Sequence, residues 1–591
     1  MDILSQIKAT VQQAVQNLFQ VDIAEEQIVI NETDANFEGD FTIVTFPLVK
    51  ILKQAPDKIA QQLGDTLLQL NNNFVAFNVV KGFLNISIAP QYWIDFIQKN
   101  FDNPIYFETA KQTEKILIEY SSPNTNKPIH LGHIRNNVLG YALTGLYKAS
   151  GYNTHSCNLI NDRGIHICKS MLAWQKFANG ETPESSGMKG DHFVGKYYVL
   201  FNTYYKEEIA VLINNGMSED EAKQKAPILL EAQAMLKQWE DGKEAVVQLW
   251  KTMNDWVYSG FKTTYENLGI SFDKYYYESN TYLLGKAIVE EGLQKNIFFK
   301  KENNSVWIDL TADGLDEKLL LRSDGTSVYM TQDIGTADLK YQDFKMDKSI
   351  YVVGNEQDYH FKVLKLILEK LGRPHADGLT HFSYGMVELP DGKLKSREGN
   401  TVDADMIMAE MIQTAKEQTE ALGKIDDFTE AEKTELYKTI GLGALKFFML
   451  RVDPKKRILF NPKESIDLHG YTAPFVQYSY ARAKSILRNA ANEINLATSI
   501  NTIAIAELDL IKHLYQYKTI LVEATQEMQP SKWIDYIYET AKLFNKFYNE
   551  CSILNADNEA EKQFRLALTQ LTANCIKNGF AIVGIQVPEK M

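Results

Sequence analysis

The sequence predicts a multidomain α/β plus all-α protein: a small α+β domain, a parallel-sheet domain and a C-terminal helical bundle, in that order. Three observations lead to this prediction. The chain has 591 residues, which is more than a single hydrophobic core accommodates. Short apolar runs alternate with helical patterns between residues 115 and 177, which is typical of a parallel sheet. From about residue 405 onward the apolar spacing is helical.

Composition and charge limit the class of protein. The chain is 45% hydrophobic, but no apolar run reaches the roughly 18 residues of a membrane span. The amphipathic N-terminal stretch lacks the basic region and cleavage site of a signal peptide. The net charge of −14 argues against a nonspecific nucleic-acid binder, although it permits a local basic face. Four widely spaced cysteines without a CxxC pair indicate a reducing compartment and no protein-held structural metal. We therefore expect a cytoplasmic protein with no membrane partner.

Residues 1–105 predict the small α+β domain. The helical patterns cover 3–19 and 55–70, and the strand-like runs cover 27–30, 41–44, 74–80 and 82–88. No segment here has a pattern typical of catalysis, so we expect a structural or RNA-docking role.

One stretch, Lys115 to Gly151, predicts a strand, a loop and a helix in this order. The residues His130-Leu131-Gly132-His133 stand at the start of this helix. In an open α/β sheet, a nucleotide phosphate sits at such a helix N-terminus. Gly132 allows close approach to the backbone, and His130 and His133 can direct N–H donors at phosphate oxygens. The competing interpretation is a loop with two chance histidines, but the chain contains only ten histidines in all.

The alternation of strands and helices continues after this stretch. Strand-like runs return at 154–160, 297–300, 306–309, 349–353 and 380–390, and a helix is expected at 165–177. We assign 106–400 to a Rossmann-type domain with a mainly helical insertion at about 178–295, in which 178–194 reads as a surface loop. Residues 401–465 form a helical connector, and 466–591 form a helical bundle with a continuous helix expected over 506–526.

A second candidate site is Lys393-Leu394-Lys395-Ser396-Arg397-Glu398-Gly399-Asn400. Its three cations could clamp a polyphosphate, because lysine supplies point charge and arginine supplies forked donors. In isolation the competing interpretation is a solvated basic turn. The two loops together fit one site that binds a triphosphate from both ends.

HLGH followed far downstream by KLKSR resembles the paired HIGH and KMSKS signatures of class I aminoacyl-tRNA synthetases. SSPNTNKPIHLGHIRN, GTSVYMTQDIGTA, YVVGNEQDYHF, LPDGKLKSREGN and FVQYSYARAKSI, in this order, resemble the arginyl-tRNA synthetase family. The resemblance implies an arginine-tRNA ligase, a monomer that uses L-arginine, tRNA(Arg) and ATP with Mg²⁺. It also implies a tRNA-docking N-terminal domain, a Rossmann-type catalytic domain and an anticodon-binding bundle.

The resemblance also implies roles for individual residues. The catalytic set is Lys127, His130, Gly132, His133, Lys393 and Arg397, and ATP binding adds Lys395 and Ser396. This chain departs from the class pattern because Ser396 replaces the second lysine of KMSKS. Many arginyl enzymes share that loss and carry a lysine just upstream of HIGH, where this chain has Lys127. The competing interpretation of Lys127 is an ordinary exposed loop lysine.

The implied arginine pocket consists of Glu119, Asn124, Tyr329, Asp333 and Gln357. Carboxylates suit a guanidinium, which carries five donors in a rigid fork. Asp333 and Gln357 could instead only cap helices. The implied anticodon contacts are Phe475, Gln477, Tyr478 and Met591.

Three alternatives remain open at this point. The chain could be another class I synthetase, for lysine, glutamate or cysteine, although the zinc ligands expected for cysteine are missing. It could be a nucleotidyltransferase of the same superfamily that acts on a small acid, but the long helical C-terminus does not fit. It could be a noncatalytic RNA-binding paralogue, against which the intact HLGH, Lys127 and Lys393 argue.

Overall fold

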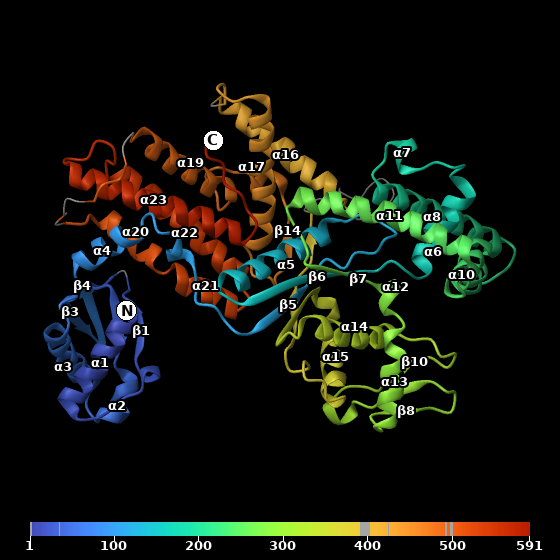
Figure 1. The fold of residues 1–591 in the computed structure, drawn as a ribbon, viewed down its shortest axis with the longest axis horizontal. Coiled ribbons are helices and arrows are strands. Elements are labelled where there is room, and N and C mark those ends of the chain that lie inside the picture. Colours follow the sequence, from blue (N-terminus) through green and yellow to red (C-terminus); the bar gives the residue numbers. More distant parts are fainter. Residues whose placement is uncertain are drawn as a thin grey trace. The chain divides into compact units, whose positions relative to one another are not determined.

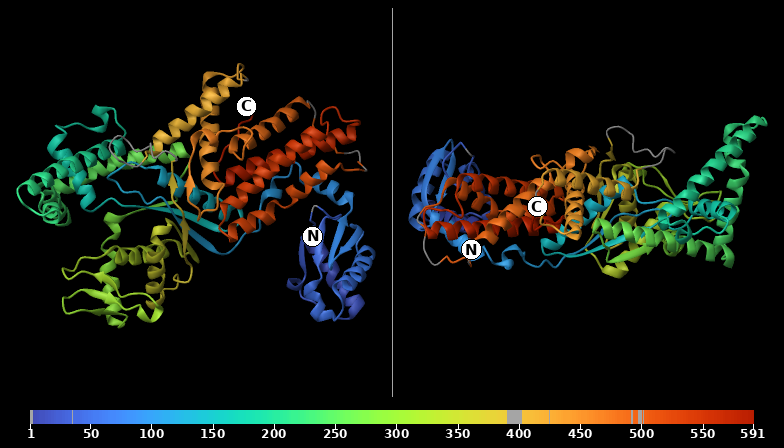
Figure 2. Two further views of the ribbon diagram at one scale, coloured as in Figure 1. Left: turned by 180° about the vertical axis from the view of Figure 1, so that it is seen from behind. Right: turned by 90° about the horizontal axis from the view of Figure 1, so that it is seen from above.

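The structure is a computed structural model that describes residues 3–34, 36–389, 402–423, 425–490, 493–496, 500 and 502–591. The chain forms two compact units (Figure 1, Figure 2). The first comprises Met1–Tyr106, Ser485–Tyr515 and Leu543–Ala573, and the second comprises Phe107–Lys484, Gln516–Lys542 and Asn574–Met591. None of the helices in the described ranges combines the length and hydropathy that crossing a bilayer requires.

The first unit contains an antiparallel four-stranded sheet in the order β1-β2-β4-β3. Its elements are α1 (Ile3–Phe19), η1 (Glu25–Gln27), β1 (Val29–Glu32), β2 (Phe41–Val44), α2 (Phe46–Leu52), α3 (Pro56–Leu70), β3 (Phe74–Val80), β4 (Phe83–Ile88), α4 (Pro90–Asn100) and η2 (Pro104–Phe107). The predicted helices and strands are present, and the sequence reading missed the two helices α2 and α4, each of which begins with a proline in its first turn.

Helix α20 (Ile505–Tyr515) belongs to the same unit. The hydroxyl of Tyr515 accepts a 2.7 Å hydrogen bond from the backbone N–H of Ile3. Its ring packs edge-on against Trp93 and Phe96, with centroids 5.6 and 5.2 Å away. The expected continuous helix over 506–526 is therefore wrong: it ends at Tyr515, whose ring fills this aromatic core, and α21 (Tyr517–Gln526) starts anew.

The second unit is built on a parallel five-stranded sheet in the order β12-β11-β5-β6-β7. The strands are β5 (Lys115–Glu119), β6 (Asn153–Ile160), β7 (Lys274–Tyr277), β11 (Lys348–Gly354) and β12 (Leu379–Tyr384). This confirms the predicted Rossmann-type parallel sheet. The sequence reading missed β7, a short aromatic edge strand.

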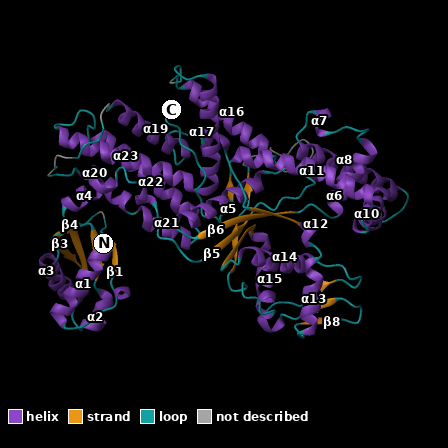
Figure 3. Cartoon of the chain, in the orientation of Figure 1, coloured by secondary structure: helices purple, strands orange, loops and turns teal. Residues whose placement is uncertain are grey.

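Helices cover both faces of this sheet. Helix α5 (Leu131–Ala149) and α14 (Tyr329–Phe344) lie on opposite sides of it, and α15 (Asp358–Lys370) packs beside α14 and against β12 (Figure 1, Figure 3). Helix α6 (Ile165–Phe177), which follows β6, packs against the helices of the insertion instead. Right-handed crossovers that leave a central strand in opposite directions produce this arrangement. Helix α5 packs closely, because a Cβ added at Gly140 would come within 2.2 Å of Cγ of Tyr120.

The insertion is helical, as expected. Its helices are α7 (Pro183–Ser186), α8 (Gly190–Asn214), α9 (Glu219–Lys225), α10 (Pro227–Glu240) and α11 (Glu244–Leu268). The expected surface loop over 178–194 is shorter, because Thr182 caps α7 by accepting from the backbone N–H of Ser185. After β7 come α12 (Glu278–Thr281), α13 (Leu284–Gln294), β8 (Phe298–Lys300), β9 (Val306–Ile308), η3 (Thr311–Asp313) and β10 (Lys318–Leu321).

The rest of the second unit is mainly helical. It comprises η4 (Asn355–Gln357), β13 (Val387–Glu388), α16 (Ala404–Ala421), α17 (Glu430–Leu450), β14 (Ile458–Leu459), α18 (Pro462–Ser465), α19 (Ala473–Asn489) and parts of α22 (Pro530–Glu550) and α23 (Glu559–Ile582). Thr429 and Glu432 form a capping box that starts α17. The predicted all-α C-terminal region is confirmed.

Replacing Gly140 with alanine tests the close packing of α5. The added methyl group gains helix propensity but collides with Tyr120, so we expect a net loss of about 1–3 kcal/mol in the free energy of unfolding. Urea unfolding measures it. The matched control is Gly354→Ala, where nothing lies within 4 Å of the added methyl group and φ is −59°. A stabilised Gly140→Ala protein would contradict the packing described here.

Candidate active site at the carboxyl end of the central sheet

The candidate site lies at the carboxyl end of β5, in the middle of the parallel sheet. β5 pairs with β6 on one side and with β11 on the other. The chain leaves β5 through α5 to reach β6, and it reaches β11 through α14 from the opposite direction. The strand order therefore reverses beside β5, which is where open α/β sheets bind ligands.

The HLGH motif forms the start of α5. His130 is the residue before the helix, in an extended conformation, and its backbone N–H donates to Nδ1 of His133 over 3.3 Å. The two ring centroids lie 3.9 Å apart. A Cβ at Gly132 would come within 3.1 Å of Cε1 of His130, so glycine suits this position. The motif thus places two imidazoles side by side at the first turn of the helix.

Both imidazoles are neutral near pH 7. Burial, together with the charge of Lys127, lowers the pKa of His130 to about 4. Burial, with the charges of His130 and Lys127, holds the pKa of His133 well below its ordinary value. Because Nδ1 of His133 accepts a backbone N–H, its proton is on Nε2, from which it can be donated to a ligand.

Lys127 supplies the positive charge of this region. Its side chain is half-buried, and burial lowers its pKa. Among the described residues, no carboxylate forms an ion pair with its ammonium group. A cation without a protein counter-ion, beside two neutral N–H donors and a helix N-terminus, favours binding of an anion such as a polyphosphate.

Two polar residues in the turn after the motif, Arg135 and Asn136, hold α5 in place, and sequence reasoning missed both. Arg135 is fully buried and donates to the carbonyl oxygens of Met386, Pro454 and Lys456 over 2.7–3.0 Å. Asn136 donates to the carbonyl oxygen of Val352 over 2.7 Å. The available signal was their position, because two polar residues within an apolar helical face need buried partners.

The turn after β5 is strained. Ser121 and Ser122 are consecutive residues with φ of 79° and 46°, a left-handed conformation that side chains rarely adopt. The N–H of Ser121 donates to Oδ1 of Asn136 over 2.5 Å, and that of Ser122 donates to Oδ1 of Asn158 over 3.0 Å. These bonds keep the loop that leads to Lys127 close to the sheet.

Glu119, which was expected to offer a free carboxylate to the ligand, is instead paired within the protein. It ends β5, is buried, and forms an ion pair with Lys340 on α14. Burial opposes the charge of Lys340, but the Glu119 carboxylate outweighs this effect and raises the lysine pKa. The negative charge predicted for the arginine pocket at this position is therefore already neutralised within the protein. A direct contact between Glu119 and arginine stays a prediction.

The other four residues of the predicted arginine pocket lie at the carboxyl edge of the sheet. Tyr329 begins α14 and is 74% exposed, and Asp333, one turn later, bonds through Oδ2 to Nε2 of His360 at 2.6 Å. Asn124, exposed after β5, forms a bridge with the residue after β6, and Gln357, exposed, ends the short helix after β11. These four side chains therefore come from elements that flank the reversal of strand order.

A fifth residue near this edge, Glu278, was missed by sequence reasoning. It follows β7 directly. Burial raises its pKa to about 7; the negative charges of Asp162 and Asp333 add to this effect, and the positive charge of Arg163 opposes it. Within the described part of the chain, no cation forms an ion pair with Glu278. An acid left without a partner in this way suits a cationic ligand.

The second predicted loop lies outside the described residues, including Lys393, Lys395, Ser396 and Arg397. The residues just after it are described. The N–H of Leu131 donates to the carbonyl oxygen of Val402, and the N–H of Ala404 donates to that of Ile129, both over 2.9 Å. The chain that follows KLKSR is thus paired with the backbone of the HLGH motif.

The predicted anticodon residues fall into two groups. Phe475, half-buried, packs against Tyr538, and Tyr478 and Met591 line one mainly apolar pocket. Gln477 is fully buried and donates to the carbonyl oxygens of Thr439 and Gln586. Its amide hydrogens are thus used within the protein, which favours an anchor for the C-terminal tail over a base contact.

The comparisons with known proteins cover the whole chain. The family of class I (R) tRNA synthetase catalytic domains matches residues 100–461, the DALR anticodon binding domain matches 476–591, and the arginyl tRNA synthetase N-terminal domain matches 5–88. The chain belongs to the arginyl-tRNA synthetase family. It is 50% identical to the arginine–tRNA ligase of Parabacteroides distasonis over 100% of both chains. It is 52% identical to that of Flavobacterium psychrophilum over 99% of both.

Solved structures of arginyl-tRNA synthetases have the same fold as this chain. The arginyl-tRNA synthetase of Thermus thermophilus superposes with a TM-score of 0.82, at 23% identity and over 100% of both chains. That of Plasmodium falciparum superposes with a TM-score of 0.74, at 19% identity, over 100% of this chain and 99% of the other. The arginyl-tRNA synthetase fold therefore extends over both units.

Proposed function

We propose that this chain activates L-arginine with ATP and transfers the arginyl group to the 3′ end of its cognate tRNA, tRNA(Arg). The observation that carries the proposal is the HLGH motif at the reversal of strand order, in a chain that matches arginine–tRNA ligases from end to end. The matched anticodon-binding and N-terminal domains supply the tRNA-binding part of the proposal.

In the first step, a carboxylate oxygen of arginine attacks the α-phosphorus of ATP. The bond from that phosphorus to the bridging oxygen breaks, and pyrophosphate leaves with both electrons of that bond. Such a reaction requires positioning and charge stabilisation rather than a protein nucleophile. We assign the N–H groups of His130 and His133 to the phosphate oxygens that gain charge, and the ammonium group of Lys127 to the same charge.

Lys393, Lys395, Ser396 and Arg397 are proposed to complete the phosphate contacts, on the resemblance of KLKSR to the class signature. The cation of Lys127 supports its assignment as the substitute for the lysine that this signature lacks. Mg²⁺ is proposed to enter as part of the ATP substrate, held mainly by the phosphates.

In the second step, a hydroxyl of the terminal ribose attacks the arginyl carbonyl carbon, and AMP leaves. Phe475, Tyr478 and Met591 are proposed to contact the anticodon. Gln477 is proposed to act through the C-terminal tail, because its amide already binds Gln586.

Arginine recognition is proposed to rest on the carboxylates of Asp333 and Glu278 and on the hydroxyl of Tyr329, with Asn124 and Gln357 at the α-amino and carboxylate end. Glu119 is proposed to support the pocket from the end of β5 without binding arginine directly, because Lys340 already neutralises its charge. Lysine cannot reproduce the guanidinium fork, and citrulline lacks its charge. Rejection by unpaired buried polar groups is strong enough that no editing site is required.

We also propose that the protein works as a monomer in the cytoplasm. The four cysteines are all free and buried, which suits a reducing compartment. The first experiment tests the proposed activity directly against the noncatalytic RNA-binding paralogue considered from the sequence.

The first experiment is arginine-dependent ATP–pyrophosphate exchange by the purified chain, with and without total tRNA. We expect exchange with arginine and tRNA together, and none with lysine or citrulline, because the family resemblance implies activation that needs tRNA. Exchange with arginine in the absence of tRNA would support arginine as the substrate but refute the requirement for tRNA. Absence of exchange in every reaction would favour the noncatalytic paralogue.

Lys127→Ala tests the proposed phosphate contact. Removal of a charge that acts on the transition state should lower the kcat of exchange about 100-fold or more, while the KM for arginine changes little. The matched control is Lys111→Ala, an exposed lysine ahead of β5, which should leave both constants unchanged. Equal losses in kcat and in arginine binding would refute a transition-state role.

Glu278 predicts how arginine binding depends on pH. Its pKa is raised to about 7, so its carboxyl group is neutral below that pH and charged above it. The KM for arginine in the unmodified enzyme should therefore fall as pH rises from 6 to 8, by about 3-fold or more. Glu278→Gln should raise the KM and remove this dependence. An unchanged pH profile in the variant would remove Glu278 from the pocket.

A further inference from the structure

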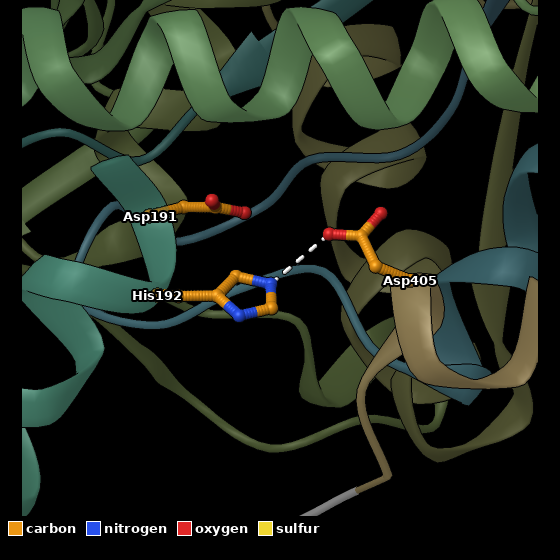
Figure 4. Close-up of side chains that lie close together, drawn as sticks. All are labelled: Asp191, His192 and Asp405. Atoms are coloured by element: carbon orange, nitrogen blue, oxygen red, sulfur yellow. Dashed lines mark hydrogen bonds and ion pairs between the residues drawn. The ribbon is translucent and has the colours of Figure 1, made fainter. Parts of the chain in front are cut away.

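A cluster of charged side chains joins the start of α8 to the start of α16 (Figure 4). Nε2 of His192 lies 3.0 Å from Oδ2 of Asp403 and 3.0 Å from Oδ2 of Asp405. The ammonium group of Lys189 lies 2.5 Å from Oδ2 of Asp405 and 3.1 Å from Oδ2 of Asp191. The residue before α16 and the second residue of α16 are thus bound from the insertion, while Asp403 also caps α16 through its other oxygen.

Helix α11 closes the cluster from a third side. Thr264 donates to Oδ1 of Asp405 over 3.1 Å. Asp191 is fully buried, and a Cβ at Gly260 would come within 2.3 Å of its Oδ1. Three helices that are distant in the sequence therefore share one partly buried polar contact.

The backbone at the start of α16 is paired with the candidate active site. The backbone groups of Val402 and Ala404 exchange hydrogen bonds with those of Leu131 and Ile129, and Asp403 lies opposite His130. Helix α8 also supports this region directly, since a Cβ at Gly195 would come within 2.9 Å of Cδ of Pro128. The first turns of α8 thus contact both the loop that precedes the motif and the start of α16.

A metal ion is the competing occupant of this cluster. Donor atoms of Asp191, His192 and Asp405 lie within 4.8 Å of one another, close enough to share a cation. The ammonium group of Lys189 already contacts two of these three residues. It supplies the positive charge that a metal would bring, and it would repel one.

We propose that Lys189, Asp191 and His192 are positioning residues for ATP-dependent activation, because they hold the first turn of α16 and, through its backbone, the HLGH turn. This inference rests on the proposed function. The three residues lie in the insertion and do not reach the reacting atoms; they act through Asp403 and Asp405. The insertion thereby contributes to the phosphate-binding end of the site.

The charges of the cluster make the contact depend on pH. The cluster contains one ammonium group and three carboxylates, those of Asp191, Asp403 and Asp405. Protonation of His192 adds a second positive charge and so reduces the excess of negative charge. The hydrogen bond to Asp405 raises the pKa of His192; burial and the charge of Lys189 oppose this, and Asp403 and Asp191 add to it. Burial disfavours the Asp405 anion, but hydrogen bonds from His192 and Lys189 outweigh it and lower its pKa to about 2. The third helix, α11, presents the hydroxyl of Thr264 to Asp405. Burial raises the pKa of the Tyr265 phenol on the same helix, and the Asp191 carboxylate adds to this effect.

The sign of the pH dependence follows. The folded protein binds the His192 proton more tightly than the unfolded chain, so the contact is complete below about pH 6.5. It weakens as pH rises through the raised pKa, and activation should lose efficiency over the same range.

The experiment compares Lys189→Met and His192→Gln with the unmodified enzyme in arginine-dependent ATP–pyrophosphate exchange from pH 6 to 9. We expect kcat/KM for ATP to fall about 10-fold in Lys189→Met, with the KM for arginine changed less than about 2-fold. His192→Gln keeps a hydrogen-bond donor that does not titrate. This variant should therefore lack the fall in activity with rising pH that we attribute to His192. The control is Lys223→Gln, which breaks an exposed ion pair with Glu219 in the same insertion.

Thermal unfolding and metal analysis of the same proteins complete the test. Equal losses for ATP and arginine, or a pH profile that His192→Gln leaves unchanged, would overturn the proposal even if the variants unfold at lower temperature. A divalent metal bound in equimolar amount and lost in Lys189→Met or His192→Gln would also overturn it. An unmodified enzyme that shows no exchange with arginine would instead refute the proposed function, so the two failures are distinguishable.

Discussion

The whole site depends on holding the start of α5 where the strand order reverses, and the side chain of Asn136 does this through hydrogen bonds. Its Oδ1 accepts from Ser121 at the end of β5, and its amide donates to Val352 on β11 and to Tyr384 on β12. A buried amide left without any of these partners would cost about 1–3 kcal/mol. Asn136 therefore links the first turns of α5 to the strained turn, to β11 and to β12.

The sequence alone predicted the order and type of most elements, because their apolar spacing is local. It predicted the parallel sheet, the HLGH helix and the helical C-terminal region. It could not predict the pairing of Glu119 with Lys340 or the three carbonyl partners of Arg135, since these join residues far apart in the chain. The break at Tyr515 was also hidden, because both flanking segments are amphipathic and only the aromatic core of the first unit separates them.

The distribution of charge distinguishes groups that maintain the fold from groups that are ready for ligands. Arg373 binds Glu291 and Asp338, and Lys274 binds Asp343, so these charges are balanced within the protein. Lys127 and Glu278 have no such partner among the described residues. Burial lowers the pKa of Lys127 and raises that of Glu278, so in each case it favours the neutral form. Ligands of opposite charge would restore the charged forms, which is the expected behaviour of residues that await a triphosphate and a guanidinium.

The buried pair of Glu119 and Lys340 constrains how this family member can evolve. Loss of either partner leaves an uncompensated buried charge, which costs about 3–5 kcal/mol, whereas a matched apolar pair of similar volume is often tolerated. Single substitutions at either position therefore pass through an unstable intermediate. The two positions, one on a central strand and one on a covering helix, are expected to change together or not at all during divergence, so the sheet and α14 inherit their sequences as one linked unit.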